Sequence, residues 1–196
     1  MTAYELESKI EVNQLDFERL LSYGKVCKST DQLNVYYDCN GSLSNQAATF
    51  RVRFIPKGKP VMTLKIPVST TNGTRKSLEV ERELSAYADG SRPLEWQVDK
   101  DLPTEFASHL QNIGIAKLNR IGWMRNRRWI LQLADNVSVE LDRVTLPDGN
   151  VFFEVEIESA YTEVHRQAID LIHGLTTSAR PSHLSKYERF MRALLS

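Results

Sequence analysis

The segment Phe153-Glu154-Val155-Glu156-Ile157-Glu158 alternates apolar and acidic side chains without a break. Residues two apart in an extended strand point to the same face, so this segment predicts a strand with one apolar and one acidic face. The segment from Tyr4 to Val12 repeats the pattern, and its charged face carries Glu5, Glu7, Lys9 and Glu11. Such alternation over many segments predicts an antiparallel sheet with one strongly charged face.

The charges are sorted by strand. Arg51 and Arg53 share a basic strand face, Lys65 lies in a second basic strand, and Glu140 and Asp142 lie in an acidic one. An open sheet with one solvated face is the commonest cause of strict polar alternation. An exposed face usually mixes its polar residues, however, whereas sorted charges favour a closed barrel with a charged interior.

Several segments between the predicted strands show the periodicity of a helix. Asn13 is a suitable N-cap for a helix from Gln14 to Tyr23. Three more helices are predicted: from near Pro103 to before Gly114, from about Thr162 to His173, and from Ser185 to Leu195. The predicted fold class is therefore α+β, a closed antiparallel β-barrel that forms a tunnel with a charged interior and is flanked by helices. We expect one domain over residues 1–196.

The overall composition is electrically balanced. Lys and Arg number 25, as do Asp and Glu, which gives a formal net charge of zero and no general electrostatic case for a nucleic-acid or membrane partner. No leader-like segment opens the chain, and no apolar run approaches the roughly 20 residues that span a bilayer. We expect a cytoplasmic protein in which Cys27 and Cys39 are reduced.

Charges of both signs on one set of faces suit a phosphate chain with its metal ions. Arg and Lys donate hydrogen bonds to phosphate oxygens, and carboxylates bind hard divalent cations such as Mg²⁺ or Mn²⁺. Carboxylates gathered without a cation repel one another. For that reason the sequence predicts that Glu156→Gln keeps or raises the stability of the metal-free protein.

An ordered set of motifs resembles the CYTH family of triphosphate tunnel metalloenzymes. The set covers nearly the whole chain: Glu5-Leu6-Glu7-Ser8-Lys9 for E-x-E-x-K, Val35-Tyr36-Tyr37-Asp38, Thr49-Phe50-Arg51-Val52-Arg53 for R-x-R, Thr63-Leu64-Lys65 for T-L-K, Glu140-Leu141-Asp142-Arg143, the E-x-E strand at 153–158, and Ser185-Lys186-Tyr187 for S-K-Y. The resemblance implies a barrel open at both ends that acts on triphosphates.

The resemblance also implies roles for individual residues. The metal ligands for Mg²⁺ or Mn²⁺ are Glu5, Glu7, Asp142, Glu154 and Glu156. The phosphate-binding residues are Lys9, Arg51, Arg53, Lys65, Arg128 and Lys186, of which Lys9, Arg128 and Lys186 also act in the reaction. Four arginines compete for the tunnel position in the basic strand, Arg120, Arg125, Arg127 and Arg128, and we favour Arg128. Glu11, Glu83 and Glu158 are expected at a solvated rim.

The implied reaction is metal-dependent hydrolysis of a small triphosphate, either inorganic tripolyphosphate, thiamine triphosphate or a nucleoside triphosphate, and inorganic polyphosphate is a further partner. Two alternatives on the same fold stay open: a class IV adenylyl cyclase, and a binder of polyphosphate or nucleotide without turnover. A nucleic-acid protein built on residues 120–128 is disfavoured, because strand alternation divides those arginines between two faces.

Overall fold

The computed structural model describes residues 6–71, 74–85, 87 and 92–195. The chain forms two compact units. The first unit combines Met1–Gln32 with Met124–Ser196, and the second unit is Leu33–Trp123. Two long strands, β2 (Lys25–Asp38) and β7 (Lys117–Ala134), run from one unit into the other. The prediction of a single domain is not tested by this division and stays a prediction.

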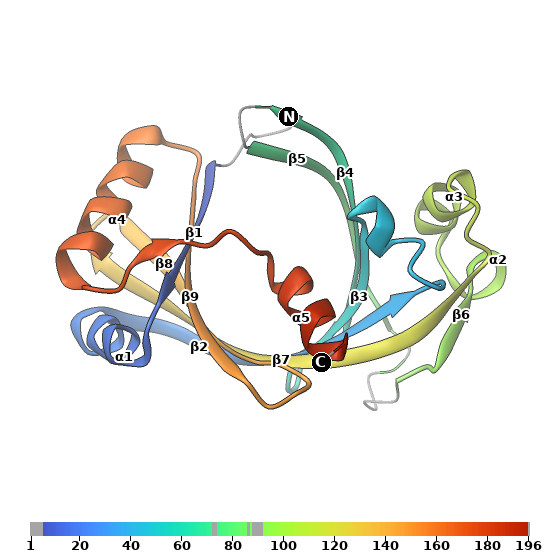
Figure 1. Cartoon of the computed structure of the whole chain (residues 1–196), viewed down its shortest axis with the longest axis horizontal. Helices are drawn as coiled ribbons and strands as arrows, with labels where there is room; N and C mark the ends of the chain where they lie inside the picture. Colours follow the sequence, from blue (N-terminus) through green and yellow to red (C-terminus); the bar gives the residue numbers. More distant parts are fainter. Residues whose placement is uncertain (1–5, 72–73, 86, 88–91, 196) are drawn as a thin grey trace. The chain divides into compact units, whose positions relative to one another are not determined.

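The first unit is an antiparallel sheet covered by helices. Its outer strands pair in the order β10-β1-β9-β8-β7, with bounds β1 (Leu6–Val12), β8 (Val137–Thr145), β9 (Val151–Ser159) and β10 (Arg180–Pro181). Three helices belong to this unit: α1 (Gln14–Tyr23), α4 (Thr162–Leu175) and α5 (Lys186–Leu195). Figure 1 shows α1 and α4 against β1, β8 and β9, with α5 on the opposite side of these strands.

The apolar faces of these strands form the core of the first unit. Leu141, Val155 and Ile157 are buried there together with Phe17 of α1. The Phe17 ring lies 5.5 Å from that of Trp129 and 4.7 Å from that of Phe153, so aromatic contacts fix the helix to the sheet. The predicted N-cap is confirmed, because the Asn13 side chain accepts a 2.8 Å hydrogen bond from the Asp16 amide. With the apolar face covered in this way, the charged face of the same strands points away from α1 and α4.

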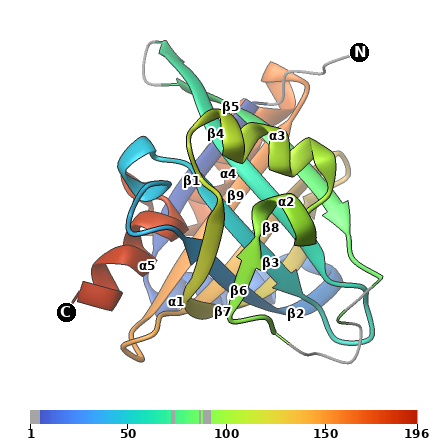
Figure 2. The same ribbon diagram turned by 90° about the vertical axis from the view of Figure 1, so that its right-hand side faces the viewer.

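The second unit repeats the arrangement with different elements. Its strands are β3 (Thr49–Phe54), β4 (Val61–Thr71), β5 (Thr74–Glu83) and β6 (Glu95–Gln97), and its helices are α2 (Val98–Asp101), α3 (Thr104–Asn112) and a 3₁₀ turn at Ser44–Gln46. Figure 2 shows α2 and α3 in front of β3 and β4. Phe50, Leu64, Trp96 and Phe106 are buried between these layers.

The predicted closed barrel is wrong. Among the described residues the hydrogen-bonded order is β10-β1-β9-β8-β7-β2-β3-β4-β5, with β6 on β7, which is an open path with β10 at one end and β5 at the other. Charge sorting does not require closure, because the acidic strands β1, β9 and β8 are already neighbours and so are the basic strands β3 and β4. Pro181 of β10 lies opposite Ile10, and a proline is suited to an edge because it lacks an amide donor.

The flanking helices of the predicted fold class are present, and the antiparallel α+β character is confirmed. Within the described residues, no helix has both the length and the apolar character that crossing a membrane requires.

Candidate functional site

Strand register gathers acidic residues on the charged face of the first unit. In the pairing of β1 with β9, Glu7 lies opposite Glu158 and Lys9 lies opposite Glu156. In the pairing of β9 with β8, Glu156 also lies opposite Glu140, and Glu154 lies opposite Asp142. Like charges directly opposite one another destabilise a sheet, so these pairs need cations beside them. We call the following residues the carboxylate cluster: Glu7, Glu140, Asp142, Glu154, Glu156 and Glu158.

Arg128 of β7 is the first of three cations in contact with this cluster. It lies opposite Asp142 in the register, and its Nε and Nη2 donate hydrogen bonds of 2.8 and 2.6 Å to the two Asp142 oxygens. Nη2 also donates to Glu156 Oε2 at 2.8 Å, and Nη1 pairs with Glu140. Burial alone would lower the pKa of Arg128, but Asp142, Glu156 and Glu140 raise it above its ordinary value. The guanidinium is therefore fixed as a permanent charge.

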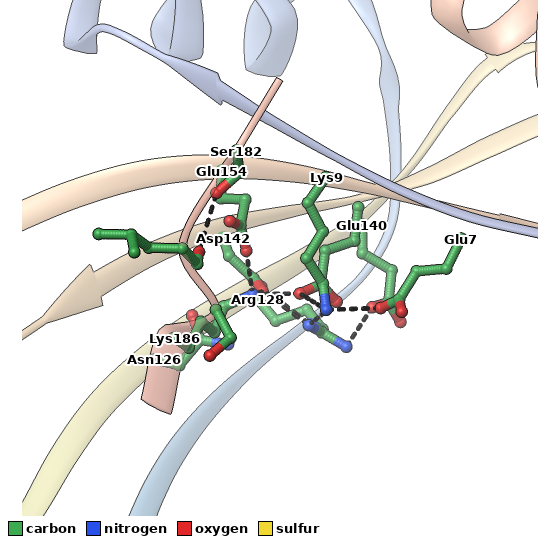
Figure 3. A network of polar contacts seen from close by, with 12 residues as sticks. Glu7, Lys9, Asn126, Arg128, Glu140, Asp142, Glu154, Ser182 and Lys186 are labelled. Atoms are coloured by element: carbon green, nitrogen blue, oxygen red, sulfur yellow. Dashed lines mark hydrogen bonds and ion pairs between the residues drawn. The ribbon is translucent and has the colours of Figure 1, made fainter. Parts of the chain in front are cut away.

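Lys186, the first residue of α5, reaches the other end of the cluster. Its Nζ lies 2.6 Å from Glu154 Oε1 and 2.9 Å from Asp142 Oδ2, and it also pairs with Glu156 Oε1. The hydroxyl of Ser182, in the segment before α5, donates a 3.0 Å hydrogen bond to the Leu184 carbonyl, and the Ser182 amide donates a 2.8 Å bond to the Lys9 carbonyl. The chain leading into α5 is thus tied to β1, which aims Lys186 at the carboxylates (Figure 3).

Lys9 is the third cation. Its Nζ lies 2.6 Å from Glu7 Oε1 and 3.8 Å from Glu156 Oε1. Burial would lower the pKa of Lys9, but Glu156 and Glu7 outweigh it and raise the pKa. Both Glu156 oxygens are therefore engaged by basic side chains, Oε1 by Lys9 and Lys186 and Oε2 by Arg128. Glu156 lies at the centre of the network.

The carboxylates differ in their protonation equilibria. Burial would raise the pKa of Glu156, yet Lys186, Arg128 and Lys9 hold it well below its usual range. Burial raises the pKa of Glu154 despite Lys186, and Glu156 adds to the increase. Burial likewise raises the pKa of Glu140 to about 7 against the lowering effect of Arg128, and Glu156, Glu158 and Asp142 add to the increase. Carboxylates with such divergent pKa values are typical of functional sites.

The donor set fits a hard divalent cation. One carboxylate oxygen from each of Glu7, Glu156 and Glu158 lies within 4.8 Å of the others. Mg²⁺ and Mn²⁺ prefer oxygen ligands of this kind. In the network drawn in Figure 3 the acidic side chains outnumber the cations Lys9, Arg128 and Lys186, so added positive charge is favoured there. These residues can therefore hold a divalent metal.

A basic strip on the charged face of the second unit contains Arg51, Arg53 and Lys65. Glu79 lies 4.0 Å from the Arg51 guanidinium and 3.6 Å from the Lys65 ammonium. Arg53 Nε donates a 3.2 Å hydrogen bond to Asn34. Arg51 Nε is buried and makes no hydrogen bond within the described part of the chain. A buried donor of this kind is suited to an incoming acceptor such as a phosphate oxygen.

Most sequence-predicted site residues lie in one of these two groups. Glu7, Lys9, Arg128, Asp142, Glu154, Glu156 and Lys186 lie in the first unit's network, and Arg51, Arg53 and Lys65 lie in the second unit's basic strip. Glu5 lies outside the described residues. Of the competing arginines, Arg125 and Arg127 are exposed, and Arg127 instead stacks on Trp129 at 4.9 Å.

Two residues of the cluster were missed by the sequence argument. Glu158 was expected at a solvated rim; it is exposed, and one of its carboxylate oxygens also lies within 4.8 Å of those of Glu7 and Glu156. Glu140 received no role, although it pairs with Arg128. Their spacing carried a signal, because Glu158 and Glu140 are each two residues from an assigned acidic residue and share its strand face. Glu11, also expected at a solvated rim, is only 15% exposed, lies opposite Glu154 in the register and pairs with Arg180 and Arg189.

Comparison with known proteins agrees with this architecture. The sequence profile of the CYTH domain matches residues 3–191. Among solved structures, a protein from Hippeastrum, described as a candidate adenylyl cyclase with a dominant triphosphatase activity, is similar with 19% identity, a TM-score of 0.74 and coverage of 96% of each chain. A candidate adenylate cyclase from Bacillus halodurans has 22% identity and a TM-score of 0.72, with 95% of this chain and 96% of that chain covered. No curated protein matches the sequence.

The fold and the site together define a class: an antiparallel α+β protein with a carboxylate cluster and basic residues on the charged face of its sheet. Because the CYTH profile covers nearly the whole chain, this protein belongs to the CYTH domain family.

Proposed function

We propose that this protein hydrolyses a small triphosphate with the help of Mg²⁺ or Mn²⁺. The observation that carries the proposal is the arrangement around Glu156, where a carboxylate cluster suited to a divalent cation shares one sheet face with Arg128 and is contacted by Lys186 of α5. Cations beside a metal site are what phosphoryl transfer needs, because its transition state spreads negative charge over the phosphoryl oxygens. The family membership supports the same substrate class.

The roles of the side chains follow from their chemistry. Glu5, Glu7, Asp142, Glu154 and Glu156 are the proposed metal ligands, and the geometry adds Glu158 to the candidates. A bound divalent cation would neutralise phosphate oxygens and lower the pKa of a water ligand. Arg128 is held rigidly by Asp142 and presents a planar donor group to phosphate oxygens. Lys9 and Lys186 would supply further positive charge to the reacting phosphate and to the leaving phosphate.

Arg51, Arg53 and Lys65 of the second unit are the remaining proposed phosphate ligands. Arg51 and Lys65 are only loosely paired with Glu79, at ion-pair distances of 4.0 and 3.6 Å. Weakly paired cations can exchange a carboxylate for a phosphate at little cost. The proposed partners remain small triphosphates or inorganic polyphosphate rather than nucleic acid, and the cytoplasmic location stays a prediction.

A substrate panel tests the proposal. Purified protein is incubated with tripolyphosphate, thiamine triphosphate or ATP at fixed Mg²⁺ or Mn²⁺, and phosphate, pyrophosphate and cyclic AMP are measured together. We expect phosphate release from at least one substrate and its loss when EDTA removes the metal. Pyrophosphate with stoichiometric cyclic AMP from ATP would identify a cyclase instead. Binding of substrates without any product would identify a binder without turnover.

A further inference from the structure

Lys186 contacts oxygen atoms of three of the proposed metal ligands, and one of them, Glu156, also belongs to the group Glu7, Glu156 and Glu158 whose oxygens lie close enough to share a metal ion. Its ammonium contacts one oxygen each of Asp142, Glu154 and Glu156, and the side chain is only 14% exposed. Three carboxylate oxygens around one small cation make a shell that a hard metal ion also prefers. The ammonium and a divalent cation are therefore competitors for the same electron pairs.

Arg128, a second cation of the network, differs from Lys186 in how it is held. Arg128 comes from the middle of β7 and makes a two-pronged contact with Asp142 on the adjoining strand, so its departure breaks two hydrogen bonds to a fully buried carboxylate. Lys186 begins a helix outside the sheet and is attached through a flexible four-carbon side chain. Of these two cations, Lys186 is the one that can yield its position.

Helix α5 keeps a second attachment that does not involve the carboxylate cluster. Arg189, one turn after Lys186, pairs with Glu11, and its guanidinium lies 4.8 Å from the centre of the Phe152 ring. The Ser182 amide donates to the Lys9 carbonyl just before the helix. These contacts hold α5 beside β1 and β9 when Lys186 moves, so displacement of the lysine requires a rotation of its side chain rather than release of the helix.

We propose that Lys186 is a resident counter-ion that a divalent metal replaces, and that the exchange frees the ammonium to bind the substrate phosphate. The inference rests on the proposed metal site. Its physical basis is that both Glu156 oxygens are engaged by basic side chains, so a metal ion bound there is repelled by these cations and competes with them for the carboxylate. Metal binding then precedes productive contact between Lys186 and substrate.

Mn²⁺ binding without substrate tests the exchange. Dissociation constants are measured by calorimetry for the wild type, Lys186→Gln and Arg192→Gln. Arg192 is an exposed residue of the same helix, so its substitution reproduces the change in net charge without touching the cluster. We expect Lys186→Gln to bind Mn²⁺ at least about tenfold more tightly than the wild type, because the competitor is gone, and Arg192→Gln to stay within about twofold. Lys186→Arg should bind no more tightly than the wild type.

Chemical labelling gives a second readout in the wild-type protein. Reductive methylation followed by mass spectrometry reports how accessible each lysine amine is. We expect Mn²⁺ to increase labelling of Lys186 severalfold and to leave Lys117, which pairs with Glu95 in the second unit, unchanged. Equal Mn²⁺ affinity in wild type and Lys186→Gln, with unchanged Lys186 labelling, overturns the exchange and leaves the proposed hydrolase standing.

Two further outcomes distinguish a failure of the proposed metal site from a failure of the proposed exchange. Absence of Mn²⁺ binding in all variants contradicts the metal site itself and with it the proposed function. Should Lys186→Gln be unfolded alone, the exchange predicts that Mn²⁺ restores its folding, because the metal takes the place of the missing ammonium. A Lys186→Gln protein that stays unfolded at saturating Mn²⁺ overturns the exchange.

Discussion

The charged faces of the two units differ in how their ions are held. In the first unit, Arg128 and Lys186 are nearly buried and contact Asp142 and Glu154, whose side chains are 0% exposed. In the second unit, Lys65 and Glu79 are 43% and 40% exposed and stand 3.6 Å apart. Buried ion pairs are costly to break, whereas exposed pairs contribute about 0–1 kcal/mol. The comparison indicates that the first unit's ion pairs contribute more to stability than the exposed pair of Lys65 and Glu79 in the second unit.

The largest effect is expected for Arg128→Gln. The change leaves Asp142, Glu156 and Glu140 without their shared counter-ion, and removal of one partner from a buried ion pair costs roughly 3–5 kcal/mol. Urea denaturation at neutral pH measures the free energy of unfolding. Arg127→Gln is the matched control, since Arg127 is the next residue, points to the opposite face and is half exposed, and we expect a loss below about 1 kcal/mol. Equal losses in both variants would contradict the difference between buried and exposed ions.

A smaller loss in the free energy of unfolding is expected for Asp16→Asn. This variant tests a buried carboxylate that is held mainly by hydrogen bonds rather than by ion pairs. Asp16 is buried in the first unit and accepts hydrogen bonds from the Ser178 hydroxyl at 2.6 Å and from the Ser178 and Thr177 amides at 2.7 and 2.9 Å. The asparagine keeps one acceptor oxygen and places an NH₂ group against these donors. We expect a loss of about 2 kcal/mol in the free energy of unfolding at pH 7.

The same variant gives a pH dependence with a definite sign. The Ser178 hydroxyl bond, aided by the Thr177 and Ser178 amides and Arg19, holds the pKa of Asp16 below its ordinary value despite burial. A depressed pKa stabilises the folded protein above the unfolded-state pKa of about 3.9, and this stabilisation is lost as the pH falls through the folded-state pKa. The difference in the free energy of unfolding between wild type and Asp16→Asn should therefore become smaller below about pH 4. A difference that grows on acidification would contradict the predicted direction of the pH dependence.

Arg53→Ala is expected to spare stability and impair function. Arg53 belongs to the basic strip and donates to Asn34 at 3.2 Å, so its loss should change the free energy of unfolding by no more than about 1 kcal/mol. If it binds phosphate, kcat/KM for the best substrate should fall at least about tenfold, equivalent to roughly 1.4 kcal/mol. Arg82→Ala is the control, because Arg82 is exposed in the same unit and pairs with Glu105. Identical kinetics in the two folded variants would remove Arg53 from the site.

Sequence periodicity predicted faces and helices well. The helix at Gln14–Tyr23 was predicted at its observed bounds, and the helices α3, α4 and α5 were placed within a few residues. Alternation with period two assigns Glu154, Glu156 and Lys9 to charged faces regardless of how the strands pair. The short helix α2 at Val98–Asp101 was missed, because four residues are too few to show a helical period.

The alternation of polar and apolar residues could predict neither whether the sheet closes into a barrel nor the register in which its strands pair. Alternation does not say which strands are edges, so an open sheet that ends at β10 and β5 has the same face pattern as a barrel. Register decides that Glu7 lies opposite Glu158 and Lys9 opposite Glu156, and it depends on turns and packing far apart in the sequence. The prediction that Glu156→Gln keeps or raises the stability of the metal-free protein considered only the neighbouring carboxylates, whereas the register also places Glu156 in ion pairs with Lys186 and Arg128, whose loss opposes that gain.

The most direct test of the central claim is phosphate release as a function of Mg²⁺ or Mn²⁺ concentration, compared between wild type and Glu156→Gln. Glutamine keeps the size of the side chain and removes the charge that we propose binds the metal. The account predicts metal-dependent hydrolysis by the wild type. For a folded Glu156→Gln protein it predicts a loss of turnover of at least about a hundredfold, or a much higher metal requirement. Unchanged activity with unchanged metal dependence in Glu156→Gln would contradict it.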